Sequence, residues 1–401
     1  MPLPVIFILI TVMLDAMGIG LIVPVMPDLI TEVTGGTLAN AALWGGLLST
    51  IFAVMQFLFG PLLGNLSDRF GRRPVLLVSL IVMAGDYVVM ALAGSIWLLF
   101  VGRVVGGITA ATNATASAYM ADLSEPGKKA QGFGLIGAAF GMGFVLGPLI
   151  GGLLAEYGTR APFWAAAGLS AANALFGYIV LRETVTDRIR RPFELRRANP
   201  FRALKAVANL PGIGPLLTIF FLYQLAFMVY PAVWAYFGQA RFEWSPGMIG
   251  LSLGLFGVMM AVVQGGLIRL FLRKLGERGT VLYGLIFDIV AFAAIAFVTS
   301  GALALILTPL AALGAVITPA LQGMMSRAVG PSRQGELQGV LTSTNAIAMI
   351  LSPLMMTTVF AAFTRSDAAV YFPGAPFLLS MGLMVLALFL FMLRSGSRVS
   401  A

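Results

Sequence analysis

Long apolar runs follow one another along the whole chain, and they constrain its fold more than any other feature of the sequence. A helix needs about 20 apolar residues to cross the hydrocarbon core of a bilayer, and it satisfies its backbone polar groups internally. The runs are too long and too uniformly apolar for the strands of a membrane barrel. An all-α integral membrane protein is therefore predicted, with twelve spans at about 4–28, 42–64, 74–94, 96–121, 131–156, 161–181, 211–237, 246–268, 280–299, 302–326, 337–362 and 372–393.

The composition supports a membrane protein and excludes several other classes. Hydrophobic residues make up 59% of the chain and charged residues only 10%, whereas soluble domains carry about a quarter charged residues. The net charge of +9 lies in short loops, which favours membrane topology over nucleic-acid binding. There is no cysteine and no histidine, so disulfides, thiol chemistry and histidine proton switches are excluded and no metal site is predicted.

The polar stretches between the runs predict the domain organisation and the orientation. The longest, 182–205, holds eight basic and three acidic residues and divides the spans six and six. We predict an N-terminal half at 1–181, a basic cytoplasmic linker at 182–210, and a C-terminal half at 211–401 with a short cytoplasmic tail. The N-terminal stretch MPLPVIFILI has no basic region and no cleavage site, so it is predicted to begin a retained first span.

Lysine and arginine are distributed very unevenly between the two sets of loops. Of the 25 in the chain, only Arg160, Arg241 and Arg365 fall in one set, Arg103 falls inside a span, and all others fall in the opposite set or in the tail. Because cytoplasmic loops carry the excess of basic residues, both termini and the linker are predicted to be cytoplasmic.

An internal repeat relates the two halves. The stretch FLRKLGERGTVL (271–282) follows the eighth span as LSDRFGRRPVLL (66–77) follows the second, and 130–149 resembles 337–354. Repeated halves favour a transporter with a substrate path between them. A helical bundle without a transport role could also keep such a repeat as a relic of duplication.

Charges are concentrated in GNLSDRFGRRPVLL (64–77), between the second and third spans. Gly71 permits a tight turn, Pro74 suits the first turn of the next helix, and Asp68 could pair with an arginine or with helix-end amides. We expect Asp122, at the cytoplasmic end of the fourth span, to be solvated or to cap a helix. The loop is interpreted as a conformational latch made by Gly64, Asp68, Arg69, Gly71, Arg72 and Arg73, although the arginines taken singly also fit simple positive-inside topology.

Small residues are regularly spaced in GLIGAAFGMGFVLGPLIGG (134–152). Such spacing lets helices approach closely, and a Gly-Pro step bends a helix locally. The alternative is ordinary helix packing. The pattern consists of Gly134, Gly143, Gly147, Pro148, Gly151 and Gly152.

These two patterns resemble the signature loop and the fifth-helix antiporter motif of the major facilitator superfamily. Within it, the chain is similar to the tetracycline-efflux family of drug:proton antiporters over nearly its whole length. The stretches that carry this resemblance are LDAMGIGLIVPVMP (14–27), SDRFGRRPVLL (67–77), GDYVVMA (85–91), GRVVGGITAATNATASAYMAD (102–122), the antiporter motif, AVWAYFGQARFEW (232–244) and PALQGMMS (319–326). The resemblance implies the major facilitator fold, with two six-helix halves, and exchange of a substrate against an ion.

Four ionisable residues lie inside predicted spans, namely Asp15, Asp86, Arg103 and Asp288. A charge at the bilayer centre costs about 2.5–3.5 kcal/mol on insertion scales, so such residues need a partner, a watery cavity or a function. At 1.5 Å per residue, Asp15 and Asp86 lie roughly 16–18 Å from the cytoplasmic ends of their helices, and Asp288 roughly 12 Å. Burial favours a protonated carboxyl and a nearby arginine favours the carboxylate, so each aspartate could carry a proton. A buried ion pair that only fixes helix packing is the alternative.

The resemblance implies that Asp15, Asp86 and Asp288 handle substrate and protons and that Arg103 takes part in proton coupling. Other cavity candidates are polar or aromatic residues within spans, each of which could equally make an interhelical hydrogen bond or an interfacial anchor. They are Gln56, Asn113, Gln224, Tyr230, Trp234, Gln264 and Gln322, with Phe227 beside the aromatic pair.

One position departs from the family. Tetracycline exporters carry a histidine four residues before the glutamine that matches Gln264, and this chain has Met260 there. Proton handling would then rest on carboxylates alone, and the soft, adaptable methionine suits a broader apolar drug pocket.

The sequence therefore predicts a monomeric inner-membrane proton antiporter, not an enzyme, which exports an amphipathic drug by alternating access. Tetracycline is the first candidate substrate, carried as such or as a divalent-metal chelate, and the proton gradient replaces any cofactor. Export of another drug or of an endogenous metabolite is the alternative. A membrane-embedded enzyme or receptor is more remote, because the chain shows no phosphate-binding loop and no paired-carboxylate motif.

Overall fold

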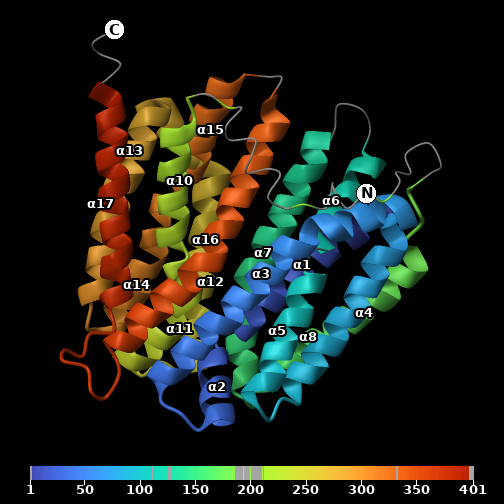
Figure 1. Cartoon of the computed structure of the whole chain (residues 1–401), viewed down its shortest axis with the longest axis horizontal. Helices are drawn as coiled ribbons and strands as arrows, with labels where there is room; N and C mark the ends of the chain where they lie inside the picture. The colour runs from blue at the N-terminus through green and yellow to red at the C-terminus, as the bar shows by residue number, and fades with distance from the viewer. Residues whose placement is uncertain are drawn as a thin grey trace. The chain divides into compact units, whose positions relative to one another are not determined.

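The computed structural model describes residues 2–110, 112–124, 129–185, 193, 199, 210, 212–330 and 333–396. Every regular element among these residues is a helix (Figure 1). Within this part of the chain, 11 continuous helical segments are long and apolar enough to cross a membrane. The predicted all-α membrane fold is confirmed.

The difference between 11 segments and twelve predicted spans arises at one place. Pro246–Phe297 forms a single helical run of 52 residues, and it covers the spans predicted at 246–268 and 280–299. Gly276 interrupts this run with a φ of 65° and a ψ of 178°, a conformation in which the chain turns without a side chain to obstruct it. The run therefore corresponds to two spans joined by a tight turn.

The chain forms two compact units. Unit 1 comprises Met1–Gly36, Ile51–Pro200 and Ser245–Gly254, and unit 2 comprises Thr37–Thr50, Phe201–Trp244 and Leu255–Ala401. The helices wholly within unit 1 are α1 (Leu3–Ile22), α2 (Met26–Thr34), α4 (Arg72–Ala91), α5 (Ile96–Thr109), α6 (Thr112–Leu123), α7 (Lys129–Ala155) and α8 (Ala161–Val180). Those wholly within unit 2 are α10 (Gly214–Phe227), α11 (Val229–Phe242), η2 (Val263–Leu267), α13 (Ile268–Phe297), α14 (Gly301–Ala311), η3 (Ala312–Val316), α15 (Ile317–Val329), α16 (Gln334–Ala362) and α17 (Ala375–Gly396).

Two helices contribute residues to both units, namely α3 (Leu38–Phe70) and α12 (Pro246–Val262). Within unit 2 the start of α3 is tied to α16, because Thr50 donates a hydrogen bond to the carbonyl oxygen of Ile350 at 3.0 Å. The boundaries expected at 181 and 211 stay a prediction, and most of the linker 182–210 lies outside the described residues.

The first predicted span, 4–28, is longer than the helix found there. Helix α1 ends at Ile22, a turn follows, and α2 begins at Met26. Val23 keeps helical φ and ψ of −56° and −48°, but Pro24 has no backbone N–H with which to continue the hydrogen bonds of α1. Pro27 is tolerated in the first turn of α2. Pro24 therefore interrupts a stretch that hydropathy alone treats as continuous.

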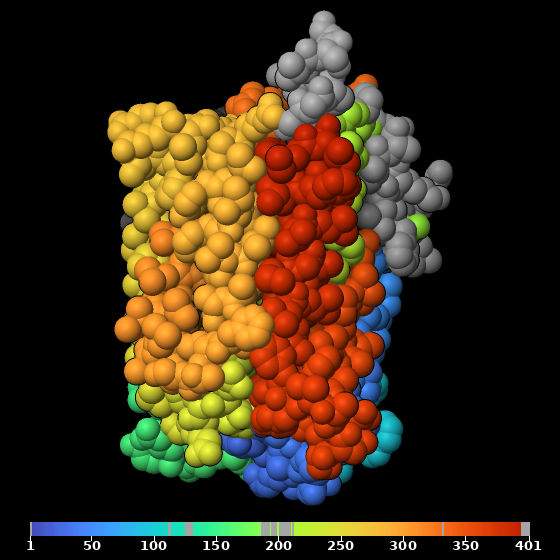
Figure 2. Space-filling model, turned by 90° about the vertical axis from the view of Figure 1, so that its left-hand side faces the viewer, coloured from blue at the N-terminus to red at the C-terminus, as the bar shows by residue number. Residues whose placement is uncertain are grey.

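Helices α13 and α17 pack side by side in unit 2, as the gold and red surfaces in Figure 2 show. Large apolar side chains remain exposed on both helices. Examples are Val290 and Phe297 on α13 and Phe389 and Met392 on α17. In water such a surface would be unfavourable, but in a bilayer it is in contact with lipid tails.

A polar cluster joins three segments at the end of α4 in unit 1. Arg160 donates to the carbonyl oxygens of Ala91 and Ala93 at 3.0 and 2.8 Å, and pairs with Glu32 on α2 at 2.8 Å. Thr159 donates a second hydrogen bond to Glu32, also at 2.8 Å. These hydrogen bonds from Arg160 and Thr159 hold the pKa of Glu32 below its ordinary value.

Candidate functional site

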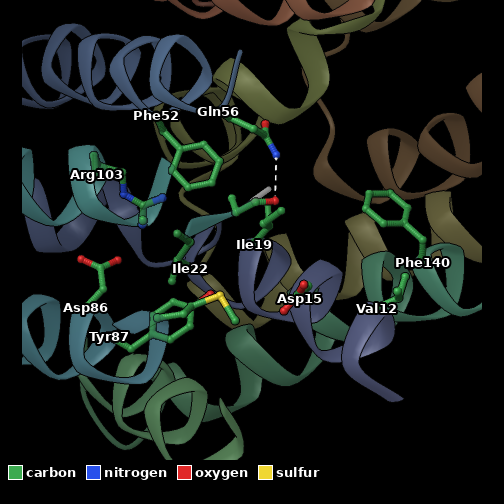
Figure 3. Close-up of a pocket in the computed structure, with 13 residues that line it drawn as sticks. Val12, Asp15, Ile19, Ile22, Phe52, Gln56, Asp86, Tyr87, Arg103 and Phe140 are labelled. Carbon is green, nitrogen blue, oxygen red and sulfur yellow. Dashed lines mark hydrogen bonds between the residues drawn. The ribbon is translucent and has the colours of Figure 1, made fainter. Parts of the chain in front are cut away.

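Three of the four intramembrane charges predicted from the sequence line one cavity in unit 1 (Figure 3). Asp15 comes from α1, Asp86 from α4 and Arg103 from α5. The cavity has a volume of about 60 Å³. A water molecule needs roughly 10–15 Å³ on this scale, whereas drug-sized ligand pockets measure about 300–1,000 Å³. The cavity could therefore hold several waters but not a whole drug molecule.

Two glycines of α5 leave room for the Asp86 carboxylate. A side chain at Gly106 would begin 2.7 Å from Oδ2 of Asp86, and one at Gly102 would begin 3.0 Å from Oδ1. The carboxylate thus packs directly against the backbone of α5, on the two turns that flank Arg103. The spacing GRVVG at 102–106 makes this close approach possible.

Arg103 extends toward Asp86 from the other side of the cavity (Figure 3). Its guanidinium lies 5.5 Å from the centre of the Phe52 ring and donates to Sδ of Met90 at 3.3 Å. Within the described part of the chain, Nε of Arg103 and Oδ1 of Asp86 are buried without a hydrogen-bond partner. A buried cation and a buried carboxylate that lack hydrogen-bond partners are energetically unfavourable in a membrane. Their presence in these helices therefore indicates a function.

Asp15 lies in the same cavity but on a different helix. Among the described residues, its Oδ1 is buried and has no hydrogen-bond partner. Nearby, Gln56 on α3 donates to the carbonyl oxygen of Ala110 at 3.4 Å. The structure therefore brings Asp15, Asp86, Arg103 and Gln56 together, as their shared cavity shows (Figure 3).

Asp288 lies on α13 in unit 2 and is not part of this cavity. It is only 5% exposed, and its Oδ2 has no partner within the described residues. Gly314 of η3 packs against the carboxylate so closely that any side chain at that position would clash with it. Asp288 is thus a second buried, incompletely bonded carboxyl.

The aromatic candidates lie in a cluster within unit 2. The ring of Tyr230 lies 4.9 Å from Phe256, 5.6 Å from Phe227 and 5.8 Å from Phe292. Trp234 packs 5.9 Å from Phe377 and is fully buried. Trp234 is therefore not an interfacial anchor, and Tyr230 presents no open stacking face in this structure.

The remaining polar candidates are dispersed. Gln224 on α10 donates to the side-chain oxygen of Asn345 on α16, a partner that sequence inspection did not identify. Met260 and Gln322 are half-buried, and Gln264 is exposed in the π-helical turn η2. The side chain of Asn113 lies outside the described residues. Their role as cavity residues stays a prediction.

The charged loop after α3 forms a network in unit 1. Arg72 pairs with Asp68, donates to Oγ of Ser67 at 2.6 Å, and lies 3.3 Å from Oδ2 of Asp122. Asp122 is exposed, as expected of a solvated residue, and it also accepts hydrogen bonds from Arg72 and from Thr184. The side chain of Arg72 is 11% exposed, but those of Asp68 and Asp122 are 30% and 20% exposed, so the carboxylates of this network remain in contact with solvent.

The loop is closed by a residue that sequence inspection assigned to the linker. The Glu183 carboxylate accepts the backbone N–H groups of Arg72 at 2.9 Å and of Arg73 at 3.2 Å, which places a negative charge at the N-terminus of α4. Gly71 has a φ of 109°, and a side chain there would clash with Glu183. An acidic residue close behind a span, in a mainly basic stretch, was the available signal.

The other two arginines of the loop contact rings, and its first glycine is open. Arg73 donates to the carbonyl oxygen of Tyr178 at 2.9 Å and lies over its ring, and Arg69 lies over Phe70. Gly64 has no neighbour that would exclude a side chain.

The repeated loop in unit 2 also contains an ion pair. Glu277, which follows Gly276 as Arg72 follows Gly71, pairs with Arg327 near the end of α15. Arg327 stands at the same distance in sequence from Asp122 as Glu277 does from Arg72. The repeat noted in the sequence therefore extends to a paired contact.

The glycines at 134–152 bring α7 close to two other segments of unit 1. Side chains at Gly143 and Gly151 would clash with the carbonyl oxygens of Met13 and Leu21 on α1, and one at Gly147 would begin 2.6 Å from that of Met17. Gly152 faces the start of α12, where a side chain would begin 2.5 Å from the carbonyl oxygen of Pro246. Gly134 has open space around it. Pro148 lies inside α7 and packs against Gly20 of α1.

Comparison with known proteins agrees with these features. Residues 8–353 match the Major Facilitator Superfamily. The chain is 42% identical to the class C tetracycline resistance protein of Escherichia coli over 357 residues, 89% of either chain. It is 41% identical to the class G protein of Vibrio anguillarum, covering 88% of this chain and 89% of that one.

Solved structures give the same fold. The crystal structure of the human organic anion transporter MFSD10 (TETRAN) matches with a TM-score of 0.70 and 27% identity, over 97% of this chain and 99% of that one. The chain is a multi-pass membrane transporter and not an enzyme. It belongs to the tetracycline resistance proteins of the Major Facilitator Superfamily.

Proposed function

We propose that this protein exports tetracycline, free or as a divalent-metal chelate, in exchange for protons. The observation that carries the proposal is the cavity shared by Asp15, Asp86 and Arg103, in which buried charged groups lack a full set of hydrogen bonds. Full-length similarity to tetracycline resistance proteins supports tetracycline as the substrate.

In this mechanism a proton and a charged group of the substrate, not the whole drug molecule, compete for the same charges. A protonated aspartate is neutral and tolerates burial, whereas an ionised one needs Arg103, water or a cationic substrate beside it. One proton that moves down a 100 mV potential releases about 2.3 kcal/mol, which can drive export. Asp288 would supply a further carboxyl in unit 2.

Alternating access would link these events to movement of the halves. The network around Arg72 would act as the conformational latch, and the close contacts of α7 would transmit movement between helices. We place the protein in the bacterial inner membrane as a monomer. Both termini would lie in the cytoplasm, because one set of loops and the tail carry nearly all the basic residues.

Transport of tetracycline with magnesium into proteoliposomes, driven by an imposed pH difference, tests the proposal. The unaltered protein should accumulate tetracycline and release protons in step. Asp86→Asn should reduce accumulation to background, while Asp367→Asn, at an exposed carboxyl, should leave it unchanged. Absence of proton movement with tetracycline in the unaltered protein would exclude this function.

A second candidate function is export of another drug or of a metabolite, and Met260 favours it. The family's histidine is absent at this position, and a methionine accommodates varied apolar ligands. Met260→His should raise tetracycline transport and narrow the range of other exported compounds. If tetracycline fails as a substrate while other drugs drive proton exchange, this second function holds instead.

A further inference from the structure

Tyr87 shares the cavity with both aspartates, although neither composition nor spacing singled it out (Figure 3). It follows Asp86 directly on α4 and is 7% exposed. Its ring reaches across to α1, where its hydroxyl lies against Gly18. Gly18 is three residues beyond Asp15, which corresponds to about 4.5 Å along the helix axis. Along the axis of α1, the hydroxyl therefore lies less than one helical turn from Asp15. The residue that carries it follows Asp86 directly in the sequence.

This position exists only because residue 18 has no side chain. A methyl group at Gly18 would clash with the Tyr87 hydroxyl. On α5, the absence of side chains at Gly102 and Gly106 likewise leaves room for the Asp86 carboxylate. Glycines on α1 and α5 thus leave space for the Tyr87 hydroxyl and the Asp86 carboxylate, both of which come from α4.

The cavity offers few other polar groups to connect the two acids. Its charged or titratable lining groups are Asp15 from α1, Asp86 and Tyr87 from α4, and Arg103 from α5; α3 supplies Gln56 and α7 supplies the apolar Phe140. Each of the two aspartates has one buried carboxylate oxygen that accepts no hydrogen bond from the described residues. A hydroxyl can donate and accept at once, whereas Arg103 can only donate.

We propose that Tyr87 is a proton-relay residue whose hydroxyl links Asp15 to Asp86 through water in their shared cavity, so that each carboxyl responds to the protonation of the other. The inference rests on the proposed role of the two aspartates as proton carriers. The Asp15 carboxyl gives a proton to a bridging water, and that water gives one of its protons to the Tyr87 oxygen. The original hydroxyl proton of Tyr87 passes to the Asp86 carboxylate. The hydroxyl is regenerated, and the net change is one proton moved from Asp15 to Asp86.

The coupling can be measured on purified protein without any substrate. Infrared absorption of protonated carboxyl groups, followed against pH, gives the titration midpoint of Asp86 when the band is assigned by its loss in Asp86→Asn. Two groups that interact by more than about one pK unit titrate as a pair and not independently. Asp15→Asn should therefore displace the Asp86 midpoint by about one pH unit in the presence of Tyr87, and by less than half of that in Tyr87→Phe.

Matched variants separate coupling from folding. Tyr157→Phe removes a hydroxyl from an 85% exposed tyrosine and should leave the displacement intact. Gly18→Ala should reduce it as Tyr87→Phe does, whereas Gly168→Ala, which meets open space, should not. An equal displacement with and without the Tyr87 hydroxyl, or no displacement by Asp15→Asn at all, overturns the inference.

The infrared titrations use no drug, so their results remain valid if tetracycline is not the substrate. An additional transport measurement links them to function. Tyr87→Phe should retain exchange of substrate across vesicles without a pH difference but lose most of the stimulation that a pH difference provides. Equal loss of both activities would mean that Tyr87 only supports the fold.

Discussion

Glu277 pairs with Arg327 in unit 2 as Arg72 pairs with Asp122 in unit 1, but with the two charges exchanged. In each case one partner follows the glycine of a tight turn and the other lies near the end of a later helix. Exchange of both charges preserves the attraction, so the contact can be tested by reversing it.

Single reversal of either charge in unit 2 should weaken the fold. Arg327→Glu places two carboxylates together, and because Arg327 is 68% exposed the loss should be about 1 kcal/mol or less. The double variant Glu277→Arg with Arg327→Glu should recover the stability in thermal unfolding in detergent. If the double variant is as unstable as the sum of both single variants, the ion pair contributes nothing.

The glycines of α7 should differ sharply in their tolerance of alanine. Gly143→Ala and Gly151→Ala add a methyl group against carbonyl oxygens of α1, and should destabilise the protein by about 1–3 kcal/mol. Gly134→Ala and Gly141→Ala meet open space and should be neutral or stabilise the helix by up to about 1 kcal/mol. Unfolding in mixed detergent micelles measures the difference, and equal costs at all four sites would contradict the packing described.

Glu183 should behave as a cap of α4. Glu183→Ala removes the acceptor for two backbone N–H groups and should cost about 0.5–2 kcal/mol in the free energy of unfolding. Gly71→Ala should cost at least as much, because it combines a strained φ with a clash against Glu183. Glu156→Gln serves as the control, and a Glu183 variant as stable as this control would remove the capping role.

The Glu32–Arg160 contact predicts a pH dependence of stability. Because the pKa of Glu32 is lowered in the folded protein, the ion pair stabilises the fold above the ordinary pKa of glutamate and is lost as the pH falls through the lowered value. Glu32→Gln should therefore reduce the melting temperature at neutral pH, and the difference from the unaltered protein should shrink below about pH 4. A difference that persists at acidic pH would assign it to packing instead of charge.

The membrane class and the spans could be predicted from the sequence because hydropathy is a local property. The membrane depth of Asp15, Asp86 and Asp288 was calculated from helix rise alone and stays a prediction. The first span was too long in the prediction because Pro24, which hydropathy does not register, interrupts the helical hydrogen bonds after α1 ends at Ile22. The run Pro246–Phe297 likewise looked like two spans, and the conformation of Gly276 explains how both descriptions apply.

The site divides in the same way between local and tertiary information. The aspartates, Arg103 and the patterned glycines could be recognised as unusual for a membrane span from the sequence, because a charge or a missing side chain is evident from one position. Three relationships are visible only in the folded chain: Asp15 and Asp86 share a cavity, Tyr87 lines that cavity, and Glu183 closes the charged loop. Those relationships depend on which helix faces are in contact, and contact between distant segments leaves no mark in the local pattern of a single sequence.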